Sequence, residues 1–534
     1  MTIVTLVGIF ITSFLIGTIS NGIKDKVTSL QRGHSLVLER NHVVIIGFDE
    51  NVTSIVAELA LANENQKNPV VVIMADHDKT DMEEVIRERV PDLYNLRVIC
   101  RSGHPDSVKD LKVCSLDTCR SIIINLVDDF MTVKTMLACE SLLDEYGNTD
   151  AYITATVRDR EVLQPAKIAG GDRAEVLNFQ KTISRLMVQT SRNPGMSEVL
   201  TELLSFKGNE IYVLDVPEVR GKSFSEINLR MPTATAIGVV RDGTPLLNPD
   251  ADSLVLEGDQ LIVISLDDDQ PEICDAATID DSAFARGDDA DLEPQTLLVF
   301  GCTDMLAQII REVDGSSAPG SRIIVAAEPG HIDTDLLPDQ GQLTNVEIDV
   351  RATKIFARRV LEGLVAEQPT SIMLLSDPTI DAEEADARTL MLQLQLTDIA
   401  EGIGVDIPLT IEMNSTRNQR LSQMMRATDF VVSSRVTAKM MAQIAEERHK
   451  KDILNDLLSE GGSTVDMKPI THYVRTDVAV DFYTLGASAA RYGEIAIGYK
   501  KFADDGTFTI EVNPRSKAAA KFGDADSLIV IAHE

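Results

Sequence analysis

The sequence has 534 residues, 44% of them apolar, which is enough for about three or four domains and excludes a disordered or fibrous protein. Acidic residues outnumber basic ones by 84 to 50, and the formal charge of −34 argues against a nucleic acid as partner and favours cations. The six cysteines form no C-x-x-C pair, so neither a disulfide scaffold nor a zinc site is expected. We expect most of the chain to lie in a reducing compartment.

The first 23 residues, MTIVTLVGIFITSFLIGTISNGI, contain no charged side chain. As a helix rising about 1.5 Å per residue, this run is long enough for a hydrocarbon core of about 30 Å. A secretory signal peptide would carry its basic residues before the apolar run, and a buried soluble helix would be shorter and show a polar stripe. Here the basic residues come after the run, at Lys24, Lys26, Arg32 and Arg40.

The sequence therefore predicts a transmembrane helix over residues 1–23 and a linker over residues 24–41. The positive-inside tendency places everything after the helix in the cytoplasm, so we expect a membrane protein with most of its chain cytoplasmic. A single span cannot form an ion pathway. If the chain moves ions, it needs further helices, either upstream in a longer product or in other subunits.

From His42 onward, short β-branched runs alternate with amphipathic helices, a pattern that predicts right-handed βαβ crossovers and a parallel sheet. The first set of predicted strands covers Val43–Ile46, Val70–Met74, Arg97–Cys100, Ser121–Asn125 and Tyr152–Val157. The same pattern starts again near Gln295, with predicted strands at Thr296–Phe300, Arg322–Ala327, Val346–Asp349, Ser371–Leu375 and Leu409–Glu412. The chain is thus predicted to hold two Rossmann-like units.

A β-rich region follows each unit, and both regions contain an Asn-Pro pair, then a Gly-Asp pair, then LIVI. This repetition indicates duplication of a two-lobed module. The fold class is α/β, and the predicted parts are a Rossmann-like domain over 42–205, a small lobe over 206–268, an acidic linker over 269–294, a second Rossmann-like domain over 295–460 and a second lobe over 461–534. Eleven acids and one base between residues 267 and 293 indicate that the linker is solvated.

A dinucleotide site needs glycines where the first strand meets its helix. That turn reads Gly47-Phe48-Asp49-Glu50-Asn51-Val52, with only the first glycine of G-x-G-x-x-G, and the second copy, from Gly301 to Leu306, also has one. Gly47 and Asp76 are the positions that a cofactor would use, but the acids at 49 and 50 would repel a pyrophosphate, so nucleotide binding is not expected. The common catalytic motifs are also missing from the sequence, and we expect no enzyme.

Six acids follow predicted strands of the first unit: Asp49, Glu50, Asp76, Asp78, Asp128 and Asp129. Ligands of open α/β sheets bind at the carboxyl edge, where these side chains would converge. Clustered carboxylates suit Ca²⁺, so a calcium site is predicted at this edge. The alternative is that each acid caps a helix or lies in a solvated loop.

An apolar helix that leads into two tandem two-lobed modules resembles the RCK (regulator of K⁺ conductance, TrkA-like) architecture. The segment GTISNGIKDKVTSLQRGHSLVLERNHVVIIGF, residues 17–48, resembles the CASTOR/POLLUX ion-channel family. Further similar segments are LANENQ at 61–66, VICRSGHPDSVKDL at 98–111, IAGGD at 168–172 and LNPDADSLVLEGDQLIVI at 247–264. The resemblance implies a homotetramer whose eight RCK modules form a ring. It also implies that ligands such as Ca²⁺ shift the conformation of the ring and that the ring pulls on the last pore helix. The family's earlier membrane helices and filter do not precede Met1, so we expect a truncated or misassigned start.

The predicted function is the regulatory gating-ring part of a cation channel, with potassium as the expected ion. Its predicted partners are the membrane and upstream pore helices from the same or other subunits. One alternative is a nucleotide-sensing regulatory subunit of a K⁺ uptake system, which would need an intact glycine loop and no membrane span. Others are a membrane-anchored NAD(P)-binding protein and a structural ring without a ligand.

Overall fold

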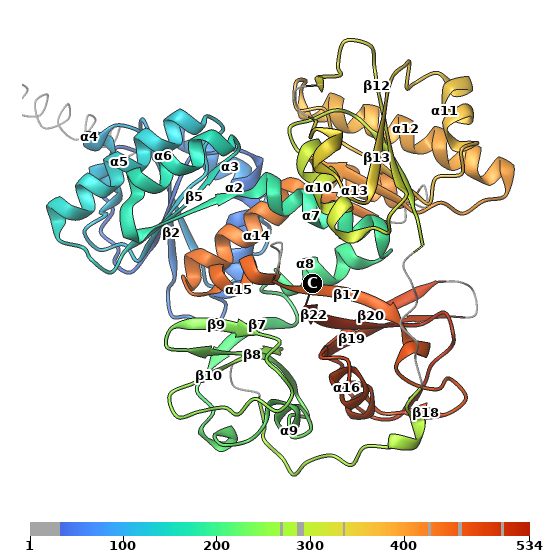
Figure 1. The fold of residues 1–534 in the computed structure, drawn as a ribbon. Coiled ribbons are helices and arrows are strands. Elements are labelled where there is room, and N and C mark those ends of the chain that lie inside the picture. The colour runs from blue at the N-terminus through green and yellow to red at the C-terminus, as the bar shows by residue number, and fades with distance from the viewer. Residues whose placement is uncertain are drawn as a thin grey trace, which may run out of the picture. The chain divides into compact units, whose positions relative to one another are not determined.

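The computed structural model describes residues 33–267, 271–285, 293–334, 337–424, 429–457, 462–503 and 507–533 (Figure 1). The transmembrane helix predicted over 1–23 and the predicted linker up to residue 32 lie outside these ranges. Within them, no helix combines the length and the apolar character needed to cross a membrane.

The chain divides into two compact units. The first unit consists of Met1–Phe179 together with Met441–Arg448, and the second of Gln180–Met440 together with His449–Glu534. The first unit therefore combines segments that lie far apart in the sequence, whereas the second is interrupted only by residues 441–448.

The first unit is built on a parallel sheet of six strands in the order β3-β2-β1-β4-β5-β6. Its strands are β1 (Val43–Ile46), β2 (Val70–Ala75), β3 (Arg97–Ser102), β4 (Ser121–Ile124), β5 (Tyr152–Val157) and β6 (Ala174–Asn178). This is the Rossmann strand order, with its reversal between β1 and β4. The predicted α/β fold with a parallel sheet is confirmed, and β6 is an additional strand that the sequence pattern did not indicate.

Helices cover both faces of this sheet, as the fully buried residues of β1 require. They are α2 (Glu50–Ala62), α3 (Lys79–Arg89), α4 (Val108–Leu111), α5 (Asp129–Tyr146) and α6 (Arg160–Gly170), with short 3₁₀ turns at Lys112–Cys114 and Gly171–Arg173. Helix α2 packs on the sheet through one apolar face, because Val52, Ile55, Val56 and Leu59 recur at helical spacing and are all buried. Helix α5 ends at Gly147, whose φ of 67° is the left-handed conformation typical of a helix C-terminus.

Residues 441–448 complete the first unit through a two-pronged ion pair. The guanidinium of Arg120 donates to both carboxylate oxygens of Glu446, each at 2.6 Å. The amide of Asn63 donates to the same carboxylate at 2.9 Å, and the hydroxyl of Tyr152 donates to the carbonyl of Ala445 at 2.5 Å. Arg120 and Glu446 are 326 residues apart in sequence, so the complete unit includes residues from both halves of the chain.

The second unit contains another six-stranded parallel sheet with the corresponding order, β13-β12-β11-β14-β15-β16. Its strands are β11 (Thr296–Phe300), β12 (Ser321–Ala327), β13 (Val346–Ala352), β14 (Ser371–Leu374), β15 (Leu409–Met413) and β16 (Asp429–Val432). The helices that follow these strands are α10 (Leu306–Ser316), α11 (Arg358–Val365), α12 (Ala382–Ile403), α13 (Thr416–Met424) and α14 (Ser433–Glu446), with a 3₁₀ turn at Gln340–Gln342. The second Rossmann-like sheet is therefore confirmed.

Helix α7 (Phe179–Arg192) comes from the N-terminal half of the sequence, but all of it after Phe179 belongs to the second unit. The hydroxyl of Ser184 donates to the carbonyl of Met305 at 3.4 Å, and the guanidinium of Arg185 donates to Thr464 at 2.8 Å. Helices α8 (Met196–Leu203) and α15 (Lys450–Leu457) also belong to this unit. Segment exchange is thus reciprocal: each unit includes a piece that follows the other sheet in sequence.

Two four-stranded antiparallel sheets form the β-rich lobes, both in the second unit. The first consists of β7 (Glu210–Leu214), β8 (Ala234–Arg241), β9 (Thr244–Leu247) and β10 (Gln260–Ser265), and the second of β17 (Ser463–Pro469), β19 (Ile495–Phe502), β20 (Phe508–Val512) and β22 (Ser527–His533). Short helices α9 (Phe224–Asn228) and α16 (Phe482–Ala490), 3₁₀ turns at Pro217–Val219, Asp281–Ala283 and Ile470–His472, and the pair β18 (Ala479–Val480) and β21 (Ala520–Lys521) complete this region.

The duplication extends to backbone details. A β-bulge lies beside Gly238 in the first lobe and beside Gly498 in the second, and at either position a Cβ would approach a carbonyl oxygen to 2.5 Å or less. Asn248 and Asn513, which open the repeated Asn-Pro pairs, have φ values of 46° and 41°. Each Asn donates its side-chain amide to the other lobe, Asn248 to the carbonyl of Gly493 at 2.8 Å and Asn513 to that of Thr233 at 3.0 Å. The repeated motif therefore joins the lobes through matching hydrogen bonds.

The described part of the acidic linker, residues 271–285, is bonded to both lobes. The backbone amide of Cys274 donates to the carbonyl of Arg230, and that of Asp280 donates to the hydroxyl of Thr484. Ala283 is 1% exposed and lies in the core of the second lobe. All four acids between residues 271 and 285 are exposed, as expected for a solvated linker, whereas Ala283 anchors the segment to the second lobe.

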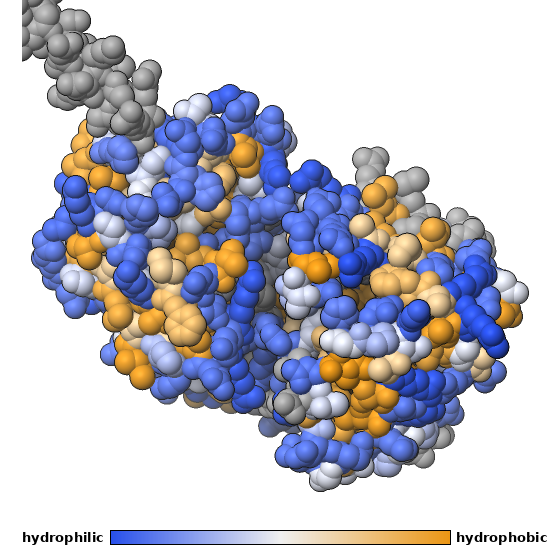
Figure 2. Space-filling view, turned by 90° about the horizontal axis from the view of Figure 1, so that it is seen from above, coloured by the Kyte–Doolittle hydropathy of each residue, from blue (hydrophilic) through white to orange (hydrophobic). Residues whose placement is uncertain are grey.

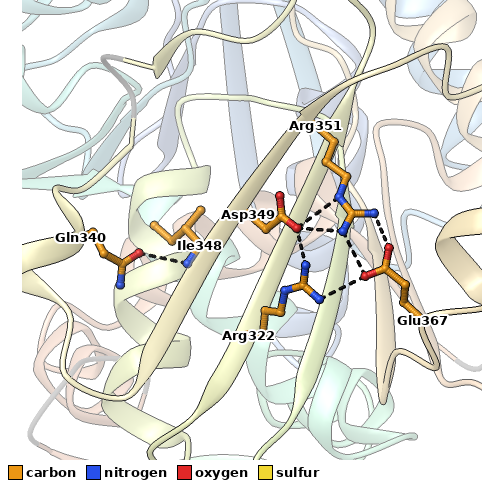
Figure 3. Close-up of polar contacts among 6 residues, drawn as sticks. All are labelled: Arg322, Gln340, Ile348, Asp349, Arg351 and Glu367. Atoms are coloured by element: carbon orange, nitrogen blue, oxygen red, sulfur yellow. Dashed lines mark hydrogen bonds and ion pairs between the residues drawn. The ribbon is translucent and has the colours of Figure 1, made fainter.

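Charged and amide side chains lie on and beside β13, the edge strand of the second sheet, and hinder its pairing with another strand (Figure 3). Arg322 and Arg351 both pair with Asp349 and Glu367, with Arg351 Nη2 at 2.8 Å from Asp349 and 3.0 Å from Glu367. These arginines hold the pKa of each carboxyl below its usual range. The amide of Gln340 accepts from the backbone of Ile348 at 3.0 Å and donates to the carbonyl of Val346 at 2.8 Å, as a neighbouring strand would.

Glu446→Ala should destabilise the first unit by roughly 1–3 kcal/mol, because Arg120 would lose two charged hydrogen bonds at a site where both side chains are largely buried. The measurement is the thermal unfolding of the full chain, in a double-mutant cycle with Arg120→Ala. The exposed pair Lys112 and Glu145 is the control, and Glu145→Ala should leave the transition unchanged. Equal effects of the two glutamate variants would contradict the assigned role of Glu446.

Candidate functional site

The carboxyl edge of each parallel sheet is where the Rossmann fold places ligands. At the first edge, Gly47 has a φ of 113°, and a Cβ there would lie 2.0 Å from the carbonyl oxygen of Asn125. Its amide donates to the carbonyl of Met74 at 2.8 Å. The glycine thus allows three strand ends to meet closely, which explains its presence without a cofactor.

Asp49 occupies the position at which a bound phosphate would meet the first helix. Its carboxylate accepts from the backbone amides of Asn51 at 2.9 Å and Val52 at 3.3 Å, and from the side chain of Asn125 at 2.7 Å. Burial raises the pKa of Asp49, and these hydrogen bonds oppose that rise. The N-terminus of α2 therefore already holds a carboxylate from the chain itself.

The other acids of the predicted calcium site also have partners. Asp78 and Asp128 cap α3 and α5, with Thr80 N at 2.7 Å and Phe130 N at 2.8 Å. The remaining three acids pair as follows: Glu50 with Arg89 at 2.8 Å, Asp76 with His104 at 3.3 Å, and Asp129 with the backbone amides of Arg158 and Asp159.

No group of three or more His, Cys, Asp or Glu side chains lies in a metal-binding arrangement within the described ranges. Three of the six acids act as helix N-caps, which is the alternative that the sequence left open. The calcium site and the cofactor roles of Gly47 and Asp76 stay predictions.

The corresponding edge of the second sheet differs at its helix. Gly301 has a φ of 108° and donates to the carbonyl of Ala326 at 3.0 Å, much as Gly47 does in the first copy. Helix α10, however, has Met305 as its N-cap residue, and no described side chain is hydrogen-bonded there. The start of α10 thus has no side-chain cap like Asp49 in α2, although the amides of Leu306 and Gln308 donate to the carbonyls of Thr303 and Met305.

A cavity of about 600 Å³ opens at this second edge. Thr303, just before α10, lines it and is 6% exposed, and its hydroxyl has no hydrogen-bond partner among the described residues. Glu328 lines the cavity directly after β12, the place that Asp76 takes after β2, and Arg388 of α12 lines it as well. A helix start without a side-chain cap, an unpartnered buried hydroxyl and a carboxylate after the second strand together form a site for a polar ligand.

The same edge contains a carboxyl group with a strongly shifted pKa. Glu412, near the end of β15, accepts from the amide of Ser376 at 3.0 Å and the hydroxyl of Ser433 at 2.8 Å. Burial raises its pKa to about 7, and the nearby charge of Asp386 adds to the rise. The protonation state of Glu412 therefore changes near neutral pH.

The cavity residues Thr303, Glu328 and Arg388 were not predicted from the sequence. Glu328 could have been found, because it follows the second strand of its sheet as Asp76 does in the first copy. Nothing in the sequence indicates that Thr303 belongs to a site, since the lack of a hydrogen-bond partner for its hydroxyl depends on how the surrounding chain folds.

Two family models match the chain. Residues 38–133 match the calcium-activated potassium channel slowpoke-like RCK domain, and residues 180–280 match "Castor and Pollux, part of voltage-gated ion channel". The probable ion channel POLLUX of Arabidopsis thaliana is 28% identical over 98% of this chain and 68% of its own length. The ion channel CASTOR of Lotus japonicus is 28% identical over 92% of this chain and 62% of its own length.

The chain thus spans about two thirds of the length of the relatives it matches. Among solved structures, the human SLO3 gating ring has a TM-score of 0.66 at 13% identity, covering 92% of this chain and 99% of that one. The resemblance to CASTOR/POLLUX-type ion channels is confirmed, and the fold of the chain resembles that of the human SLO3 gating ring.

Glu412→Gln should stabilise the protein near pH 8 and have little effect near pH 5. The folded-state pKa lies above the unfolded value of about 4.3, so the stability that the neutral carboxyl contributes is lost as pH rises through about 7, by up to about 3 kcal/mol. The glutamine stays neutral at both pH values. The measurement is thermal unfolding of the full chain at the two pH values, with the exposed Glu347→Gln as control. A pH-independent difference between variant and wild type would contradict the shifted pKa.

Proposed function

We propose that this chain is the cytoplasmic gating-ring part of a cation channel, with potassium as the expected ion. The similarity to CASTOR and POLLUX ion channels over nearly the whole chain supports this function, as does the gating-ring fold. In this proposal, residues 1–23 form the last pore helix, and the remaining pore helices come from further chain upstream or from other subunits. Four chains with eight RCK modules form the ring.

The observation that carries the proposal is the reciprocal exchange of segments. Residues 441–448 belong to the unit of the first sheet, and α7 belongs to the unit of the second. A ligand that changes the packing in either unit therefore acts on a segment that leads along the chain to the other sheet. Such an element can be biased between two packings by differential ligand binding.

Exposed apolar side chains on the Rossmann-like domains support assembly into a ring. Phe130 and Leu137 of α5 are 78% and 54% exposed, and their spacing of seven places them on one helix face. In the second copy, Met391 and Leu394 of α12 are also exposed. Figure 2 shows apolar patches on a mostly hydrophilic surface. Contiguous apolar surface is typical of a protein interface.

The cavity at the second sheet edge is the better candidate for the regulatory ligand. Its helix N-terminus and the Thr303 hydroxyl suit an acceptor such as phosphate, and Glu328 is placed to bind sugar hydroxyls. Arg388, which also pairs with Glu384 at 2.6 Å, supplies positive charge to a lining that contains the acids Asp304, Asp333 and Asp377 as well. A nucleoside phosphate combines these groups, and we propose it for the second module. Ca²⁺ at the first edge, on Asp49, Glu50, Asp76, Asp78, Asp128 and Asp129, is the rival ligand.

The oligomeric state tests the ring. The full chain in detergent should have the mass of four copies by native mass spectrometry, and Phe130→Glu combined with Leu137→Glu should lower that mass without unfolding the protein, because charges would enter an apolar interface. Leu256→Glu, at a residue that is 48% exposed on the first lobe, is the control. A monomeric wild type would contradict the ring.

Thr303→Val tests the ligand. The variant removes a buried unpaired hydroxyl while keeping the side-chain shape, so the thermal transition should stay the same or rise. Binding of AMP or ADP, measured by isothermal titration, should weaken by about tenfold, whereas any binding of Ca²⁺ should be unchanged. Absence of nucleotide binding to the wild type would remove the nucleoside phosphate. Calcium binding that disappears with Asp76→Asn would favour the first edge instead.

A further inference from the structure

A small, mostly apolar cavity lies between the two β-rich lobes of the second unit. Its volume is about 260 Å³. The paired helices α9 and α16 contribute Phe224 and Phe482 to its wall, and the linker that crosses between the lobes contributes Ile279. These walls favour a ligand with an apolar body.

Glu494 and Lys517 are the charged residues of this lining. Glu494 is already paired, because its carboxylate accepts from Lys468 and from the hydroxyl of Tyr473. Lys517 is 9% exposed, and its ammonium donates to the carbonyls of Met231 at 2.6 Å and Ala234 at 2.7 Å. No carboxylate of the described chain forms an ion pair with it.

A buried ammonium without an opposite charge is unfavourable. The two carbonyls and the rings of Phe482 and Tyr483, whose centres lie 5.8 Å and 5.2 Å from the Lys517 nitrogen, only partly replace the lost hydration. Burial accordingly lowers the pKa of Lys517 to about 7. The two carbonyls accept two of the three N–H groups that an ammonium carries. An anion in the cavity would supply both a third acceptor and the missing negative charge.

Comparison of the two lobes shows that their fold does not require this cation. The carbonyl of Lys517 accepts from the amide of Phe482 at 3.2 Å, and in the first lobe the carbonyl of Ser253 accepts from the amide of Phe224 at 2.9 Å. Both carbonyls close the same kind of turn, but counted from the repeated Asn-Pro pairs Lys517 corresponds to Asp252, so the first lobe has an acid at this position and not a cation. Lys517 is a feature of one copy only, at the place where that copy borders the cavity.

We propose that the cavity between the lobes binds a small monocarboxylic acid with an apolar body, whose carboxylate pairs with Lys517. The apolar part of the ligand lies against Phe224, Ile279 and Phe482. Because the walls come from both lobes and from the linker, the bound acid holds these three parts together. This site is separate from both sheet edges, so it does not depend on the proposed channel function.

The probes are hexanoate and octanoate, with hexanamide and octanamide as uncharged counterparts, titrated calorimetrically into the full chain in detergent. At least one carboxylate should bind saturably and raise the thermal transition, and its amide should bind at least about tenfold more weakly, since it lacks the charge that pairs with the ammonium. Absence of binding by both carboxylates, or equal binding of acid and amide, would overturn the proposal.

Two variants locate the site. Lys517→Met should abolish carboxylate binding by removing the charge. Gly486→Leu should do so by filling the cavity while Lys517 stays in place: Gly486 lies in α16 on the cavity wall, and an added Cβ there meets no atom within 4 Å. Gly363→Leu is the matched control, because Gly363 lies in the exposed part of α11 and its Cβ would also meet nothing. Unchanged binding to Gly486→Leu would overturn the proposal even if Lys517→Met proved too unstable to test.

Discussion

The ion pair between Arg120 and Glu446 is the contact on which the architecture of the first unit depends. It fixes a segment from near residue 446 against a sheet that ends at residue 178. Two charged hydrogen bonds, a shared amide from Asn63 and the hydroxyl of Tyr152 converge on a few residues there. Because both side chains are largely buried, neither can lose its partner without leaving a charge in a poorly hydrated place. The consequence is that a tandem duplication does not yield two independent modules.

The two copies have kept their backbones and changed their side chains. Gly47 and Gly301 make equivalent turns, and Asn248 and Asn513 make equivalent hydrogen bonds to the opposite lobe. The chemistry has diverged around these fixed points. Asp49 fills the start of the first helix, whereas the corresponding helix start in the second copy faces a cavity with the unpartnered hydroxyl of Thr303. The equivalent helix start is thus occupied by the chain's own carboxylate in the first copy and borders a cavity in the second.

Much of the fold could be predicted, because buried parallel strands produce continuous apolar runs. The bounds of β1, β5 and β11 were predicted to the residue. Strands β6 and β16 were missed because AEVLN and DFVV are short and begin with polar or small residues. The acids after the strands were located from the sequence. Whether such a carboxylate caps a helix or faces a ligand depends on distant neighbours: the partner of Asp49, Asn125, is 76 residues away in sequence. Segment exchange leaves no periodic pattern, so it was not predicted at all.

The amide of Gln340 has a consequence for how copies of this chain meet. It occupies both the N–H of Ile348 and the carbonyl of Val346, on a strand whose outer side is otherwise open. Another chain approaching that strand finds these two backbone groups already satisfied and cannot pair with the strand at this position. Where many identical chains are crowded together, occupation of these groups acts against edge-to-edge pairing, the step from which cross-β stacking starts.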